Sequence, residues 1–253
     1  MKPLQRILFI LFWLVLIADC FFVYYGTNDY RFYSKLLLVP LLLISVLYST
    51  NKTRHPRSKL IILFILLFSW IGDVVLLTGN TDFSFVEGLL AFLIAHILYS
   101  VFFLRLVPFK KEGLLVIIMS SIFIIAYLYV FMFLLWEKIM ELQIPVTVYA
   151  LAICFMLLTA INTYNSGRIR KLGVQNFIPG AILFVVSDTL LAGNKFAYEI
   201  LNKKFDGINL YLDIAVMFTY GAAQFFLVFG AVRYLRNKSG RHSSSSHTTK
   251  AVS

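Results

Sequence analysis

Long apolar runs recur along the chain, separated by short polar segments. The runs are continuous rather than alternating, and most approach the roughly 17–25 residues that a helix needs to cross the hydrocarbon core of a membrane. We therefore predict an all-α membrane protein, a bundle of eight transmembrane helices within residues 1–236, followed by a disordered polar tail at 237–253. The expected spans are Ile7–Tyr25, Leu36–Tyr48, Lys59–Thr78, Phe85–Val107, Leu114–Trp136, Pro145–Tyr164, Phe177–Gly193 and Leu210–Leu235. The second run is short, and Ser34–Lys35 and Ser49 can extend it.

Positive charge is sorted between the two ends of this predicted bundle. The net charge of +11 would suggest a nucleic-acid partner in a soluble protein, but 60% of the residues are hydrophobic. Of the 23 Lys and Arg residues, 17 fall on the side that holds both termini and 6 on the other. The positive-inside rule places both termini in the cytoplasm. We expect a multi-pass protein that binds no nucleic acid, in the bacterial cytoplasmic membrane, or in the endoplasmic reticulum of a eukaryotic host.

Two aspartates interrupt the apolar runs in a similar way. Asp73 follows a glycine in "SWIGDVVLL", and Asp188 follows a serine in "VVSDTLL". An ionised side chain at the bilayer centre costs roughly 2.5–3.5 kcal/mol on insertion scales, so such residues face the bundle interior. The shared pattern, in two spans that run in the same direction, predicts that both aspartates face one polar cavity. Each is alternatively a buried, hydrogen-bonded packing group or a helix cap.

Other polar side chains follow helical spacing. His96 and Tyr99 share a face of the fourth span, whereas Glu87 is about half a turn out of phase with His96, so these two do not hold one ligand. Tyr220 and Gln224 lie on one stripe of the last span, together with Asp213. His96 is the only histidine within a predicted span. A multi-histidine zinc site is therefore not expected, and neither is any other metal.

Lysines lie near the outer ends of two spans. Lys195 is about two turns after Asp188, on the same face, and Lys35 lies at the start of the second span. The lysine of the second span either extends to the interface or pairs with a carboxylate or a phosphate. Cys20 and Cys154 both lie inside spans, where packing is a more ordinary role than a disulfide or a metal.

Four segments in order resemble the YhhN family of membrane proteins, which includes the animal lysoplasmalogenases. They are "FSWIGDVVLL", "FVEGLLAFLIAHILYSVFF", "GAILFVVSDTLLAGNKF" and "YGAAQFFLVFG", and "SKLLLVP" and "YALAICFMLLTA" are also similar. The resemblance covers roughly Tyr33 to Gly230. It implies an eight-helix hydrolase without a cofactor, with catalytic and substrate-binding positions at Lys35, Asp73, Glu87, His96, Tyr99, Asp188, Asn194, Lys195, Tyr220 and Gln224.

The activity implied by the resemblance is cleavage of the vinyl-ether bond of a lysoplasmalogen, a lysophospholipid, to a fatty aldehyde and glycerophosphoethanolamine or glycerophosphocholine. Protonation of the outer vinyl carbon gives an oxocarbenium ion, which water captures. Paired carboxylates do similar work in glycosidases. We expect Asp73 and Asp188 to act as acid and base, in an order that the sequence leaves open, with the substrate phosphate near Lys35 or Lys195 and other membrane lipids around the protein.

Two other functions remain compatible with the sequence. A proton-coupled transporter would use the same intramembrane carboxylates as a relay, and a lipid-binding membrane protein would need no acid pair. The sequence leaves the head-group preference and the oligomeric state open.

Overall fold

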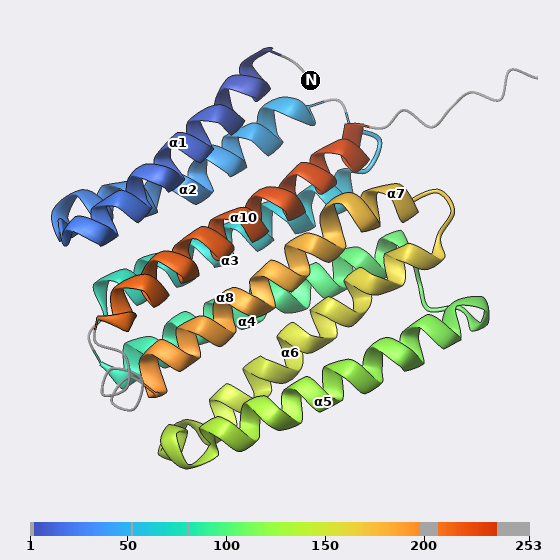
Figure 1. Cartoon of the computed structure of the whole chain (residues 1–253). Helices are drawn as coiled ribbons and strands as arrows, with labels where there is room; N and C mark the ends of the chain where they lie inside the picture. The colour runs from blue at the N-terminus through green and yellow to red at the C-terminus, as the bar shows by residue number, and fades with distance from the viewer. Residues whose placement is uncertain (1–2, 52, 80, 198–206, 237–253) are drawn as a thin grey trace, which may run out of the picture.

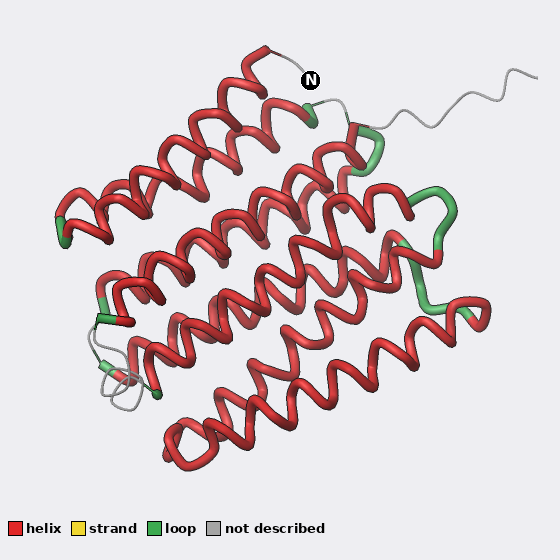
Figure 2. The backbone as a smooth tube through the Cα atoms, in the orientation of Figure 1, coloured by secondary structure: helices red, strands yellow, loops and turns green. Residues whose placement is uncertain are grey.

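The computed structural model describes residues 3–51, 53–79, 81–197 and 207–236. The predicted tail at 237–253 and the loop that holds Lys203 and Lys204 lie outside this part of the chain. The described residues form helices and short connections without strands (Figure 2), which confirms the all-α prediction. The long helices are α1 (Pro3–Tyr25), α2 (Asn28–Ser49), α3 (Pro56–Thr78), α4 (Asp82–Leu106), α5 (Leu114–Ile139), α6 (Gln143–Asn162), α8 (Ile178–Phe196) and α10 (Ile208–Arg236).

Seven helical stretches of the described residues are long and apolar enough to cross a membrane, so the chain is an integral membrane protein. The longest stretch, Lys111–Asn165, contains both α5 and α6, which are joined by the 3-10 helix Met140–Leu142 and lie side by side in Figure 1. A single straight helix of that length would extend about 80 Å at roughly 1.5 Å per residue, more than twice the hydrocarbon thickness. The eight predicted runs thus correspond to eight long helices, while eight membrane crossings remain a prediction.

Most of the long helices extend a few residues beyond their predicted apolar runs, and two of these extensions carry polar residues of the candidate site. α2 begins at Asn28 rather than at Leu36, so Ser34 and Lys35 lie within it. α8 continues to Phe196 and so includes Lys195. Its N-terminal end follows the short helix α7 (Arg170–Leu172) and the π-helical turn η4 (Gly173–Phe177). A hydropathy count ends each span where polar residues begin, but the helical hydrogen bonding continues through them.

Two helix pairs form the middle of the bundle. α3 packs along α4, and α8 packs along α10, with α1 and α2 on one flank and α5 and α6 on the other (Figure 1). The close approach of α3 to α4 depends on Gly72, where an added Cβ would lie 2.6 Å from two ring carbons of Phe92. At one end of the bundle, Arg236 Nη1 donates to Gln5 Oε1 at 2.7 Å. The start of α1 and the end of α10 therefore lie at the same end.

Candidate active site

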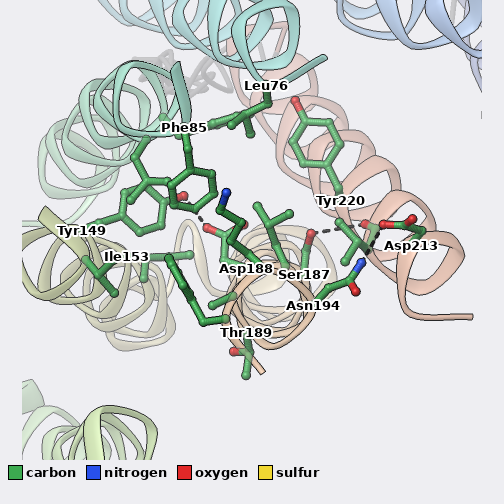
Figure 3. Close-up of a pocket in the computed structure, with 18 of the residues that line it drawn as sticks. Leu76, Phe85, Tyr149, Ile153, Ser187, Asp188, Thr189, Asn194, Asp213 and Tyr220 are labelled. Carbon is green, nitrogen blue, oxygen red and sulfur yellow. Dashed lines mark hydrogen bonds between the residues drawn. The ribbon is translucent and has the colours of Figure 1, made fainter. Parts of the chain in front are cut away.

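A cavity of about 510 Å³ lies among α2, α3, α4, α5, α6, α8 and α10. This volume is within the roughly 300–1,000 Å³ usual for small-molecule sites. Both Asp73 and Asp188 line it, so the two carboxylates share one cavity. Its apolar wall includes Phe85, Phe92 and Phe131, and its polar lining comprises Arg31, Lys35, Asp73, Thr81, Tyr127, Tyr149, Ser187, Asp188, Thr189, Asn194, Lys195, Asn209, Asp213 and Tyr220. Figure 3 shows part of this lining around Asp188.

Asp73 on α3 stands at one end of a chain of hydrogen bonds. The hydroxyl of Tyr220 on α10 donates to its Oδ2 at 2.5 Å, and the Nζ of Lys35 lies 3.9 Å from its Oδ1. Gln224 Nε2 donates to the Tyr220 hydroxyl oxygen at 3.3 Å, and the Tyr99 hydroxyl donates to Gln224 Oε1 at 3.2 Å. Apart from Lys35, all of these residues are buried. The chain fixes Asp73 from α10 and α4.

Asp188 on α8 belongs to a second group of hydrogen-bonded side chains. The hydroxyl of Tyr149 on α6 donates a short hydrogen bond to its Oδ2 (Figure 3). His96 Nε2 lies 2.9 Å from the same hydroxyl and 3.5 Å from Asp188 Oδ2. Because the tyrosine hydrogen points to the carboxylate, the hydrogen between Tyr149 and His96 belongs to Nε2. The other ring nitrogen, Nδ1, lies 3.3 Å from Met156 Sδ, and the imidazole is fully buried.

The two groups meet at α4 and are separated by an aromatic ring. His96 belongs to the Asp188 group and Tyr99 to the Asp73 group, and both residues are on one face of α4. The buried ring of Phe184 lies between the two groups. Its centroid is 4.8 Å from that of His96 in one group and 5.5 Å from that of Tyr220 in the other, with edge-to-face geometry in both cases. Each carboxylate therefore has its own set of hydrogen-bond partners within a single cavity.

Asn194 and Lys195 line the cavity near the end of α8, and both are bound to neighbouring protein groups. Asn194 Nδ2 donates to Asp213 Oδ1 at 2.8 Å (Figure 3). Lys195 Nζ lies 2.9 Å from Asp82 Oδ1 and 5.3 Å from the ring centroid of Phe85. The Lys195 side chain is 38% exposed, and the Asp82 side chain is 73% exposed. This ion pair closes one edge of the cavity where α4 begins and α8 ends.

Glu87 is the one predicted site residue that lies apart from this arrangement. It is exposed on α4 and does not line the cavity. Its charge marked it in the sequence, but its helical phase turns it away from His96 and from the interior. We therefore leave it out of the candidate site.

Tyr149 and Arg31 are cavity residues that the sequence argument did not select. Tyr149 carries no charge and lies in an apolar run, so the presence of a charge inside the membrane does not identify it. Its spacing of seven from Met156 on α6 is the available signal, because both contact His96. Arg31 precedes the apolar run of α2, so the predicted spans leave it in a loop. Within the residues described, no group of three or more His, Cys, Asp and Glu side chains is placed to hold a metal ion.

The chain is similar to a known family of membrane proteins and to two mammalian proteins. The YhhN family matches residues 30–231 of the chain. Lysoplasmalogenase TMEM86B of Sus scrofa is 30% identical over 159 residues, which cover 63% of this chain and 62% of that protein. Lysoplasmalogenase TMEM86A of Bos taurus is 31% identical over 182 residues, which cover 70% and 67%. The chain thus spans a little under two thirds of the first of these relatives. No solved structure matches the chain.

Proposed function

The chain belongs to the YhhN family, and from this premise we propose that it is a lysoplasmalogenase-like hydrolase that cleaves the vinyl-ether bond of a lysoplasmalogen. The products are a fatty aldehyde and glycerophosphoethanolamine or glycerophosphocholine. The names of the two mammalian relatives support this assignment. The observation that carries it is the single cavity lined by Asp73 and Asp188, each of which accepts a hydrogen bond from a tyrosine.

The cavity suits a lipid with one hydrocarbon chain. Its apolar wall, with Phe85, Phe92 and Phe131, offers contacts for an alkenyl chain, and its charged residues offer contacts for a polar head group. We expect such a lipid to enter the cavity from the surrounding membrane. A lysophospholipid and the bilayer lipids are then the partners of the protein, and the reaction needs no cofactor.

We assign the acid to Asp73 and the water-activating carboxylate to Asp188. The side chain of Asp188 is 15% exposed and that of Asp73 is 3% exposed, so water reaches Asp188 more readily. His96, 3.5 Å from Asp188, balances the negative charge of this carboxylate when the imidazole is protonated. In this scheme Asp73 protonates the outer vinyl carbon, and the oxocarbenium ion forms at the carbon bonded to oxygen. Asp188 stabilises the cation and takes a proton from the attacking water. It then gives this proton to the leaving ether oxygen while Asp73 takes the proton of the hemiacetal hydroxyl, so the hemiacetal separates into the aldehyde and glycerophosphoethanolamine or glycerophosphocholine, and both carboxyl groups return to their initial states.

We further propose that the chain crosses the membrane eight times with both termini in the cytoplasm. The hydrogen bond between Arg236 and Gln5 supports an even number of crossings, because it joins the start of α1 to the end of α10. The excess of Lys and Arg on that side supports the cytoplasmic orientation. The bacterial cytoplasmic membrane, or the endoplasmic reticulum of a eukaryotic host, is the corresponding location.

Aldehyde release from a lysoplasmalogen by the purified protein tests the function. Asp73→Asn and Asp188→Asn keep the side-chain size but remove the acid and the base. Each is expected to lower turnover about 10²–10⁴-fold, the usual contribution of general acid–base catalysis. Asp213→Asn is the matched control, since Asp213 lines the same cavity but, among the described residues, forms a hydrogen bond only with Asn194, and its turnover is expected to stay within a few-fold. Thermal midpoints on the same detergent preparation show that each variant is folded.

The outcome also separates the hydrolase from the transporter. If both aspartate variants keep near-parental aldehyde release, the carboxylates are not the catalytic pair. If the protein releases no aldehyde but carries protons across liposome membranes, and each aspartate variant stops that flux, the two carboxylates form a transport relay instead.

A further inference from the structure

The geometry points to α2 as the element that binds the lipid head group: Arg31 and Lys35 hold its phosphate, and Ser34, bound to Asp19 of α1, positions this turn of the helix. The inference rests on the proposed function for the identity of the lipid. It goes further by selecting one of two candidate lysine positions, by adding Arg31, and by giving α1 a part in the site.

Arg31 and Lys35 form a pair of cations on one wall of the cavity. They are four residues apart on α2, so they share a face, and both line the cavity. Arg31 Nε is buried and has no hydrogen-bond partner among the described residues. Lys35 Nζ, at 3.9 Å from Asp73 Oδ1, is beyond hydrogen-bond distance from it. A guanidinium presents planar donors that match two oxygens of a phosphate, and an adjacent ammonium adds a point charge. A phosphate at this wall would give Arg31 Nε the acceptor that it lacks among the described residues, and would share Lys35 Nζ with the longer ion pair to Asp73.

Lys195 is the less suitable phosphate partner. Its ammonium already pairs with Asp82 at 2.9 Å and lies over the ring of Phe85. A phosphate at this position would have to displace a carboxylate. The same negative charge at Asp82 would also repel the phosphate.

The charges around α2 favour an anion with a single negative charge. Asp19 is fully buried and within electrostatic range of both Arg31 and Lys35. When Asp73 carries the proton that its role as acid requires, one buried carboxylate faces two cations. Arg31, Lys35 and Asp19 then carry a net charge of +1, which the single negative charge of a phosphodiester would neutralise. A ligand without phosphate leaves one cation unbalanced in the cavity, which is unfavourable for a buried charge.

Ser34 connects this cation pair to α1. Its hydroxyl donates to Asp19 Oδ1 at 2.5 Å, and it lies between Arg31 and Lys35 in the sequence. Ser34 and Asp19 are both buried and neither lines the cavity. They are therefore positioning residues. Without the serine hydroxyl, the carboxylate of Asp19 has to take its donor from one of the two neighbouring cations. α1 ends at Tyr25, outside the residues that match the family.

Binding of single-chain lipids that cannot be cleaved tests the inference independently of hydrolysis. The ligands are lysophosphatidylcholine, whose chain is attached by an ester, and the monoacylglycerol with the same chain but no phosphate. Arg31→Gln and Lys35→Gln are expected to raise the Kd for lysophosphatidylcholine about tenfold to a hundredfold, the value of a charge-assisted hydrogen bond. The Kd for the monoacylglycerol is expected to stay within about twofold. Ser34→Ala is expected to lower the preference for the phosphate ligand, measured as the ratio of the two Kd values, about threefold to tenfold. It is also expected to lower the thermal midpoint by about 2–4 °C, because it removes the buried hydrogen bond to Asp19.

The controls and competitors decide between the alternatives. Lys138→Gln removes a positive charge from the same end of the predicted bundle without touching the cavity, and both Kd values should stay unchanged. The inference is overturned if Lys195→Gln, and not Arg31→Gln, weakens binding of the phosphate ligand. It is also overturned if inorganic phosphate displaces lysophosphatidylcholine at equal concentration, because the site then takes a free anion. If Arg31→Gln weakens binding of lysophosphatidylcholine but the parent protein releases no aldehyde, only the proposed reaction is refuted. If the parent releases aldehyde but Arg31→Gln leaves the ratio of the two Kd values unchanged, only the head-group site is refuted.

Discussion

Tyr149→Phe removes the one hydroxyl that joins His96 to Asp188, with little change in the shape of the side chain. A hydrogen bond to a charged group is worth about 1.5–3 kcal/mol in soluble proteins. Hydrogen bonds between membrane helices average about 0.6 kcal/mol and reach about 1.7. His96 Nε2 is 3.5 Å from Asp188 Oδ2, so a small shift of the imidazole replaces part of the lost interaction. We therefore expect a loss of about 1 kcal/mol in stability, or about 2–4 °C in thermal midpoint for a chain of this size.

The effect of Tyr149→Phe on turnover is expected to be larger than its effect on stability. Asp188 would be drawn toward His96 and away from the position at which we propose that it activates water. A displacement of about 1 Å at a reacting group costs about a hundredfold in rate. We expect aldehyde release to fall about tenfold to a hundredfold, measured as kcat at saturating lysoplasmalogen in the same detergent preparation as the thermal midpoint.

Tyr127→Phe is the matched control for this experiment. Tyr127 also lines the cavity, and its hydroxyl forms a hydrogen bond of 2.6 Å with Thr189, which follows Asp188 in the sequence, rather than with the carboxylate itself. Its kcat should stay within about threefold of the parent, at a similar loss of stability. If the kcat of Tyr149→Phe equals that of Tyr127→Phe, the Tyr149 hydroxyl serves only as the hydrogen-bond partner of the buried His96, and the position of Asp188 does not depend on it.

Three further predictions follow from the geometry. Gly72→Ala places a Cβ against a ring of α4 and should cost about 1–3 kcal/mol by overpacking, whereas Gly193→Ala, which meets nothing within 4 Å, should leave the thermal midpoint unchanged; equal midpoints for the two variants would contradict this packing. Tyr220→Phe, which touches Asp73, should lower turnover at least tenfold more than Tyr99→Phe, which is two hydrogen bonds further away, and similar kcat values would show that the chain of bonds does not position the acid. Reporter fusions at the C terminus and in the loop at 203–204 should lie on opposite sides of the membrane, and signals from the same side would exclude eight crossings.

The helices were predictable because their signal is local. Each apolar run corresponds to a long helix, and the errors concentrate where polar residues face the interior. The predicted second run begins at Leu36, with Ser34 and Lys35 as an optional extension, and leaves Arg31 outside, although all three residues are helical. The backbone hydrogen bonds of a helix continue whether its side chains are polar or apolar. A helical turn whose polar side chains face a cavity is therefore predicted as a loop when helices are identified by hydropathy.

The charged residues of the candidate site were predictable from the sequence, whereas residues that belong to it only through contacts between helices were not. Asp73 and Asp188 stand out because an acid in an apolar run requires an explanation. Glu87 stands out equally, but it lies little more than one turn from the start of α4, where a carboxylate reaches the interface. Tyr149 is an ordinary residue in a membrane helix, and its importance comes only from α6 lying beside α4 and α8. The rotation of one helix against another is not encoded in any single segment.

The order of these residues along the chain has a consequence for biogenesis. Lys35 precedes Asp73, and both His96 and Tyr149 precede Asp188, so each of the two aspartates of the proposed mechanism is synthesised after a side chain that lies beside it in the folded protein. During insertion, each carboxylate therefore enters a membrane that already holds its partner, which offsets part of the roughly 2.5–3.5 kcal/mol that an unpaired aspartate costs at the bilayer centre. Tyr220, the last contact of Asp73, arrives only with the final helix. A nascent chain thus inserts its acids without yet possessing a complete active site, and we expect it to be inert toward the lipids around it until synthesis of α10 is finished.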